Sequence, residues 1–278
     1  MRMISALPPE LTHAIFHLGH RKLVLVEGDD EVEVLAEWFR DDLSDILFYP
    51  AVGYANVEIY LNKILAISHK AQIYGIIDRD FRTEQEVNSS QSDETVHLFI
   101  LRRYALENYL LEPAAVWEEL RIYHGQSFKI KSSTEMEAGL LEICDKLKTI
   151  MAANWVIYES PIDVPYFSKG HTISDRMDII RQAARRLNED INQVEGKISK
   201  KETLIQATLS NLDDAYQVIN GKHIFHQVHQ KYVNEVKRGL RTDHFRNLLT
   251  RTVKEKVGLH PDILLIIKQR ILSDTSNM

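Results

Sequence analysis

The first hundred residues alternate between short apolar runs and longer stretches with apolar residues at helical spacing. Strands buried on both faces read as near-continuous runs of aliphatic and β-branched residues. Runs of this kind predict strands at Lys22–Val26, Asp45–Tyr49, Gln72–Ile77 and Thr95–Leu101. Two stretches between them, Asp30–Arg40 and Val57–Ser68, are predicted to be helices. This alternation predicts an α/β fold with an open, mostly parallel sheet that is covered by helices on both faces.

After about residue 112 the strand pattern nearly vanishes and helical periodicity takes over. Helices are predicted at Pro113–Tyr123, Ser132–Asn154, Ile173–Leu187, Ile191–Leu209, His223–Arg238, Thr242–Val257 and Pro261–Leu272. Thr83–Glu94 is predicted to be an exposed loop, and Ser160–His171 a loop or hairpin. We therefore expect an N-terminal helical segment over residues 1–19, an α/β domain over 20–125 and a mostly helical domain over 126–278.

Composition limits the class of protein. The chain has 278 residues and a formal net charge of −6, which argues against a protein that holds nucleic acid by its overall charge. No apolar run approaches the roughly 20 residues that span a bilayer, and residues 1–20 lack the layout of a signal peptide. The single cysteine, Cys144, excludes an internal disulfide and a multi-cysteine zinc site. A cytoplasmic protein is expected.

Charge is unevenly distributed along the chain. From Glu27 to Asp45 nine residues are acidic, and Arg40 is the one basic residue. From His223 to Arg270 there are ten lysines and arginines and four acidic residues. An acidic N-terminal stretch and a basic C-terminal stretch fit a metal centre beside a surface that binds phosphate groups. Two oppositely charged surface faces would give the same numbers.

Acidic residues follow two of the predicted strands, at the sheet edge where ligands collect in open α/β folds. Glu27 comes directly after the first strand, and Asp78 and Asp80 follow the third. The connection rules make these strands neighbours or near neighbours, so the three carboxylates would repel one another unless a cation compensates. Such oxygen ligands select Mg²⁺ or Mn²⁺ over zinc. Taken singly, Glu27 could instead cap the following helix, and Asp78-Arg79-Asp80 could be a turn.

Three segments resemble motifs of one family. Val26–Glu31 (VEGDDE) resembles the glutamate motif of TOPRIM domains, and Ile76–Asp80 (IIDRD) resembles their DxD motif. Leu101–Leu111 (LRRYALENYLL) is similar to the ENYLL segment of TOPRIM nucleases of the overcoming-lysogenization-defect (OLD) class. The similarity is greatest to stand-alone effectors paired with an ABC-type ATPase in bacterial anti-phage systems such as PARIS. It covers residues 20 to about 115, and the helical remainder matches only in length and in the Gly221-Lys222 step.

The resemblance implies a metal-dependent endonuclease that hydrolyses phosphodiester bonds. Glu27 matches the motif glutamate, while Glu31 and Glu107 match further acidic positions. Lys222 is similar to a lysine that follows the core of OLD nucleases. The implied catalytic residues are Glu27, Asp78, Asp80 and Lys222. The implied ligands of Mg²⁺ or Mn²⁺ are Glu27, Glu31, Asp78, Asp80 and Glu107.

One departure from the family pattern affects the ligand set. Asp29 and Asp30 stand where small or hydroxylated residues are often found. They leave open which acid near Glu27 is the second ligand.

Substrate and partners are implied by the same resemblance. Arg79, Arg82, Arg102 and Arg103 could contact phosphates, although salt bridges to the acidic cluster are the simpler interpretation for any one of them. PARIS-type effectors imply cleavage of tRNA, which halts translation during infection, whereas other OLD-like nucleases imply DNA. The resemblance also implies a homodimer when active and an ATPase partner that restrains the enzyme.

Other hypotheses fit parts of the same pattern. A non-catalytic sensor subunit would use the acids to bind Mg²⁺ structurally. A receiver domain also gathers acids around Mg²⁺, but it would have an aspartate pair after the first strand and one acceptor aspartate after the third. A primase or topoisomerase is less favoured, because the chain has no obvious zinc module or catalytic-tyrosine domain.

Overall fold

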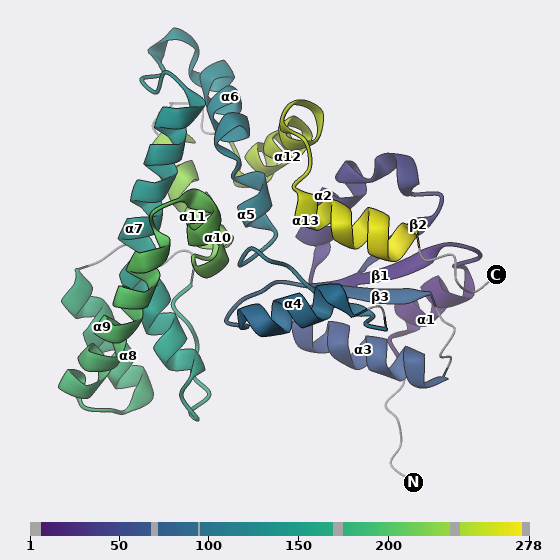
Figure 1. The fold of residues 1–278 in the computed structure, drawn as a ribbon, viewed down its shortest axis with the longest axis horizontal. Helices are drawn as coiled ribbons and strands as arrows, with labels where there is room; N and C mark the ends of the chain where they lie inside the picture. The colour runs from purple at the N-terminus through teal and green to yellow at the C-terminus, as the bar shows by residue number, and fades with distance from the viewer. Residues whose placement is uncertain (1–6, 68–71, 94, 169–174, 234–239, 274–278) are drawn as a thin grey trace. The chain divides into compact units, whose positions relative to one another are not determined.

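The computed structural model describes residues 7–67, 72–93, 95–168, 175–233 and 240–273 (Figure 1). The chain forms two compact units that do not follow one another simply in sequence. The first, called here the sheet unit, comprises Met1–Asp78, Arg82–Arg102 and Gly258–Met278. The second, called the helical unit, comprises Arg79–Phe81 and Arg103–Val257. No helix in the described part of the chain is long and apolar enough to cross a membrane.

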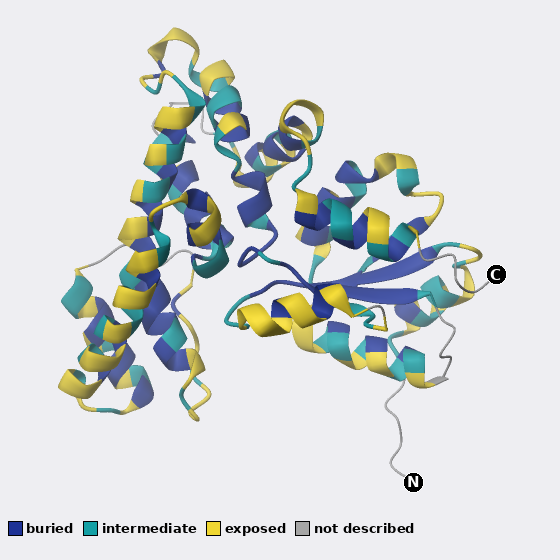
Figure 2. Cartoon of the chain, viewed as in Figure 1, coloured by how far each residue is buried: buried dark blue, intermediate teal, exposed yellow. Residues whose placement is uncertain are grey.

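Among the described residues, four strands form one parallel sheet in the sheet unit. They are β1 (Lys22–Val26), β2 (Ile46–Pro50), β3 (Ile73–Ile77) and β4 (Leu98–Ile100). Their order is β2-β1-β3-β4, and every neighbouring pair is parallel. Every residue of β1 and β3 is buried, as Figure 2 shows, which explains why their sequences are almost entirely apolar. The predicted α/β class with a parallel sheet is confirmed.

Helices cover this sheet on both faces (Figure 1). α2 (Asp29–Trp38) packs on β2, while α3 (Tyr54–Ile67) packs on β3 and β1 on the opposite face. The sheet unit also contains α1 (Pro9–Phe16), the 3₁₀ helix η1 (Arg40–Asp42) and α4 (Glu84–Ser92). Its last element is α13 (Pro261–Leu264), which continues as the π-helix η5 (Leu265–Leu272).

The prediction of a loop over Thr83–Glu94 is wrong, because α4 occupies most of this segment. Thr83 and Glu86 form a capping box that satisfies backbone donors at the helix start. The inner face of α4 buries the polar side chains of Ser90 and Gln91, which form hydrogen bonds with the neighbouring chain. Gln91 Nε2 donates to the carbonyl of Ile100 at 2.9 Å, and Ser90 Oγ accepts from the Ile100 amide at 3.0 Å. The helix therefore lacks the apolar periodicity by which helices are recognised in a sequence.

The helical unit contains no strand among its described residues. Its helices are α5 (Glu107–Leu110), α6 (Pro113–His124), α7 (Ser133–Tyr158), α8 (Arg176–Leu187), α9 (Ile191–Thr208), α10 (Leu212–Val218), α11 (Gly221–Val228) and α12 (Thr242–Thr252). Shorter turns are η2 (Gly125–Ser127), η3 (His229–Val233) and η4 (Val253–Val257). α7 is the central element, since α6, α8, α9, α10 and α11 all pack against it. α10 lies in a segment for which no helix was predicted.

The described part of the predicted loop over residues 160–171 is neither helix nor strand, and residues 169–171 lie outside the described residues. The predicted helix over 173–187 begins at Arg176 in the structure, and residues 173 and 174 are not described. The predicted helix over 223–238 is seen as α11 and η3, with residues 234–238 outside the described residues.

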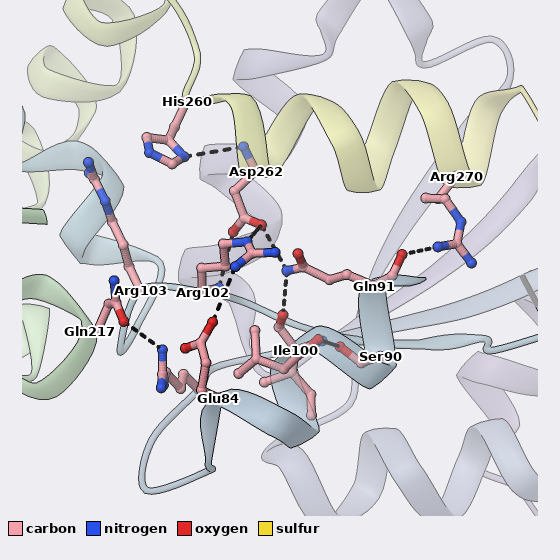
Figure 3. Close-up of polar contacts among 12 residues, drawn as sticks. Glu84, Ser90, Gln91, Ile100, Arg102, Arg103, Gln217, His260, Asp262 and Arg270 are labelled. Atoms are coloured by element: carbon pink, nitrogen blue, oxygen red, sulfur yellow. Dashed lines mark hydrogen bonds and ion pairs between the residues drawn. The ribbon is translucent and has the colours of Figure 1, made fainter. Parts of the chain in front are cut away.

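The C-terminal segment packs with the sheet unit rather than with the helices that precede it. Asp262, buried at the start of α13, accepts hydrogen bonds from Gln91 Nε2 at 2.8 Å and from the Arg102 amide at 3.1 Å (Figure 3). Lys22 Nζ donates to the carbonyl of Ile271, and Lys268 pairs with Asp42 at 2.7 Å. The boundaries of the two units therefore differ from the predicted domain boundaries at residues 19 and 125.

Candidate metal centre

β1 and β3 are adjacent and parallel, so the residues that follow them meet at one edge of the sheet. Glu27 follows β1 and Asp78 follows β3. The Asp78 amide donates a hydrogen bond of 2.9 Å to Glu27 Oε1. This bond ties the two strand ends together and fixes one carboxylate oxygen of Glu27 beside the Asp78 backbone.

Glu31 lies in the first turn of α2 and is only 8% exposed. The helix is preceded by Gly28 in an extended conformation, and a Cβ on Gly28 would lie 3.0 Å from Glu31 Oε2. Glycine at this position therefore leaves room for the Glu31 carboxylate to fold back over the helix start. The positive end of the helix dipole favours negative charge there.

Glu31 and Asp78 bring carboxylate oxygens within 4.8 Å of each other inside the sheet unit. Asp78 is also buried, at 4% exposure. Glu107 is a half-buried residue at the start of α5 in the helical unit. All three were predicted as metal ligands.

The donor atoms suit a hard divalent cation. Carboxylate oxygens are the ligands that Mg²⁺ and Mn²⁺ prefer, whereas zinc sites usually contain cysteine or histidine. Cys144 is fully buried in α7, and burial raises the pKa of its thiol to about 12. It is therefore kept as a neutral thiol, and it is not part of the acidic group.

Asp80, the second aspartate of the DxD pair, has a left-handed backbone with φ of +49°. Aspartate tolerates this conformation better than most residues. Its amide donates to the carbonyl of Tyr104 at 3.1 Å, and the neighbouring Arg79 donates to Gln217 Oε1 at 3.2 Å. The DxD segment thus turns sharply after β3, with Asp78 in the sheet unit and Asp80 in the helical unit.

Asn108, in the ENYLL segment, is fully buried and links two parts of the helical unit. Its Oδ1 accepts from the amides of Ala105 and Gly221, both at 2.9 Å. Its Nδ2 donates to the carbonyl of Ile219 at 3.0 Å. Asparagine suits this role because its one side chain both accepts and donates hydrogen bonds.

Lys222 lies directly after Gly221 in the first turn of α11. Its amide donates to Asn220 Oδ1 at 2.8 Å, which caps the helix. Asn108 thus holds the backbone before Lys222 against the segment that contains Glu107. Sequence reasoning singled out Glu107 and Lys222 but missed the buried asparagine that connects their segments. The signal for it was a polar residue directly after Glu107, in a segment that is otherwise apolar from Tyr104 to Leu111.

The arginines predicted to contact phosphates have protein partners. Arg82 donates to the Asp78 carbonyl at 3.1 Å and pairs with Glu58 at 3.7 Å. Arg102 pairs with Glu84 at 3.3 Å and with Asp262 at 3.7 Å, as Figure 3 shows. Salt bridges were the simpler interpretation of these residues, although the acids differ from those of the predicted cluster.

Arg103 is buried in the helical unit and is held by two acids. Its guanidinium pairs with Glu112 at 2.5 Å and with Asp213 at 2.7 Å, and it lies over the rings of Tyr109 and Tyr216. Burial opposes its charge, but the charge and hydrogen bond of Glu112 outweigh this and raise the pKa of Arg103. These contacts indicate a structural role for this arginine.

The basic stretch from His223 to Arg270 is divided between the two units at Gly258. Several of its cations have ion-pair partners: Lys231 with Glu142, Arg241 with Asp243, Lys256 with Glu118 and Lys268 with Asp42. The stretch is therefore not one continuous element.

Comparison with known proteins gives no match for this chain, either among protein-family models or among curated proteins.

Proposed function

We propose that this chain is a metal-dependent endonuclease of the TOPRIM type, which hydrolyses phosphodiester bonds in nucleic acid. The observation that supports the proposal most directly is the pairing of Glu31 and Asp78 at the carboxyl edge of a parallel sheet. Glu27 adds a third acid at the same edge, through its bond to the Asp78 amide. Crowded acids at this edge are expected where a cation offsets their repulsion.

Each acidic residue has its own role in the proposed mechanism, and Lys222 has another. Glu31 and Asp78 would hold the cation, and the resemblance implies Glu107 and Asp80 as further ligands. Glu27 keeps one oxygen on the Asp78 amide, so its second oxygen can accept a proton from the attacking water. A bound Mg²⁺ would neutralise charge on the phosphate and lower the pKa of water. Lys222 would stabilise negative charge on the phosphate.

The substrate and partners of the proposed enzyme rest on the resemblance to PARIS-type effectors. On that basis we propose tRNA as the preferred substrate, with DNA as the alternative, and an active homodimer. An ABC-type ATPase would restrain the nuclease until infection. These assignments give the first substrates to test.

The proposal is tested with Asp78→Asn, which keeps the side-chain shape and removes its charge. Wild type is expected to bind Mn²⁺ by calorimetry and to cleave tRNA or plasmid DNA with Mg²⁺ but not with EDTA. Asp78→Asn should weaken metal binding by more than about tenfold and lose cleavage. Asp41→Asn, at an exposed acid after α2, is the matched control and should behave as wild type.

Two results would count against the nuclease. Metal binding without cleavage of any substrate would favour a sensor subunit. Equal metal affinity in wild type and Asp78→Asn would contradict the proposed metal centre itself.

A further inference from the structure

A cluster of four aromatic side chains, called here the aromatic platform, lies in the helical unit. It consists of Phe81, Trp155, Tyr158 and Tyr166, with Phe81 in the middle. The Phe81 ring is stacked on Tyr158 with centroids 4.7 Å apart and planes 21° apart. It lies 5.4 Å from the ring of Tyr166 and 6.0 Å from that of Trp155.

The platform is open to solvent on its tyrosine side. Tyr158 is 50% exposed and Tyr166 is 47% exposed, while Phe81 and Trp155 are half-buried. Single exposed aromatic residues need no explanation, but a contiguous group marks a binding surface more often than a core.

The loop that carries Tyr166 is held rigidly. Asn154, which is 4% exposed, donates to the Phe167 carbonyl at 3.1 Å and accepts from the Phe167 amide at 2.7 Å. Arg186 lies 4.0 Å over the buried Phe167 ring and donates to the Pro165 carbonyl at 2.7 Å. These contacts fix the backbone on both sides of Tyr166, which lowers the entropy that the loop loses when a ligand binds.

The platform begins one residue after the DxD pair. Phe81 follows Asp80, and the hydrogen bond from the Asp80 amide to Tyr104 fixes the turn between them. The Phe81 ring also meets the Tyr104 ring edge-on at 5.7 Å. A ligand on the platform would thus lie close to the backbone of a proposed catalytic aspartate.

A cation lies beside the rings. Lys201 Nζ is 4.8 Å from the centre of the Trp155 ring and pairs with Glu159. Aromatic faces on which successive bases stack are a usual means by which proteins hold single-stranded nucleic acid.

We propose that the aromatic platform stacks an unpaired nucleobase of the nucleic acid that the enzyme cleaves. This inference rests on the proposed nuclease function and makes the substrate of that site single-stranded at the bound base. Every base has a π face, so the platform would select unpaired structure and not a particular sequence. A fully paired duplex would offer it no base.

The test uses the full chain in EDTA, where binding is separated from cleavage. An RNA oligonucleotide with a single-stranded 2-aminopurine should show quenched fluorescence on binding, because stacking quenches this base. Tyr158→Ala combined with Tyr166→Ala should bind the oligonucleotide about tenfold more weakly and lose the quenching. The double Tyr→Phe variant keeps the rings and should behave as wild type.

Two further controls separate stacking from other effects. Phe16→Ala, at an 82% exposed ring of α1, should leave binding unchanged. A blunt duplex should bind equally to wild type and to the alanine variant, and thermal unfolding should show that both are folded.

The outcomes distinguish this inference from the nuclease proposal. Wild-type affinity and quenching in the alanine variant, or no binding of single strands by wild type, would overturn the platform. Ring-dependent binding in a protein that never cleaves nucleic acid would support the platform and refute the nuclease.

Discussion

Asn108 shows how a single buried residue can set the geometry of a distant segment. Its side chain forms three hydrogen bonds with described backbone groups, which run from Ala105 to Ile219 and Gly221. An unsatisfied amide in this position would cost about 1–3 kcal/mol. The residue therefore fixes the start of α11, and with it the backbone of Lys222, against the segment that begins α5.

Gly221→Ala tests this set of Asn108 hydrogen bonds, called here the Asn108 clamp. A Cβ on Gly221 would lie 2.5 Å from the Asn108 backbone nitrogen and 2.6 Å from its Oδ1, so the backbone must shift. We expect a loss of about 1–3 kcal/mol in the free energy of unfolding, measured with urea. Gly196→Ala in α9 meets nothing within 4 Å and should instead add about 0.5–1 kcal/mol. Equal effects of the two changes would refute the clamp.

Cys144 predicts how stability depends on alkaline pH. Its thiol has a pKa of about 12 in the folded chain, raised by burial from an ordinary value of 9.0. Above pH 9 the unfolded chain loses this proton while the folded chain keeps it. The free energy of unfolding should therefore fall as the pH rises from 9 towards 12. Burial likewise raises the pKa of Tyr216, which adds to the fall above pH 10.

Urea unfolding at pH 8 and pH 10 in reducing buffer measures this slope. Cys144→Ala lowers stability at both pH values by leaving a cavity, but it should flatten the decline between them. An identical decline in wild type and variant would show that the thiol does not cause it.

At the scale of elements, the pattern of apolar residues was sufficient to predict strands that are buried along their whole length. β1 has the predicted bounds, and β3 differs by one residue, because β3 is a run without charged residues and β1 is one after its first residue, Lys22. It failed for α4, whose inner face buries Ser90 and Gln91 as well as Val87. Hydrogen bonds replace apolar contacts there, and a pattern of apolar residues cannot report them.

Thr83→Ala tests α4, the helix that the sequence pattern did not predict. Thr83 Oγ1 accepts from the Glu86 amide at 3.3 Å, and the Glu86 carboxylate accepts from the Thr83 amide at 2.7 Å. Loss of the cap should cost about 1 kcal/mol in the free energy of unfolding. Ser89→Ala, at an exposed position within α4, should cost nothing. A neutral Thr83→Ala would mean that α4 does not depend on its capping box.

At the scale of the whole molecule, two arrangements could not be predicted from the sequence. Residues 258–278 group with the sheet unit, because Asp262 meets Gln91 and Arg102 far back in the sequence. The aromatic platform combines Phe81 with rings from α7 and from the loop after it. Local periodicity carries no information on such long-range packing.

The acids of the candidate site could be predicted, because the carboxyl edge of a parallel sheet gathers whatever follows its strands. Asp78 was named from its position after a strand and Glu31 from the resemblance to TOPRIM motifs, and the sheet unit brings their carboxylates together. The sequence did not reveal the bond between Glu27 and the Asp78 amide. That bond makes Glu27 a positioning residue as well as a candidate base.

The central claim is that Glu27 and its neighbours cleave phosphodiester bonds with a divalent cation. Glu27→Gln keeps an oxygen that can accept from the Asp78 amide but removes the charge that could take a proton. The measurement is the rate at which wild type, Glu27→Gln and Glu33→Gln cleave total tRNA and plasmid DNA with Mg²⁺. We predict a loss of about 100-fold or more for Glu27→Gln, an unchanged unfolding midpoint, and wild-type rates for Glu33→Gln. Cleavage by Glu27→Gln at the wild-type rate would contradict the claim.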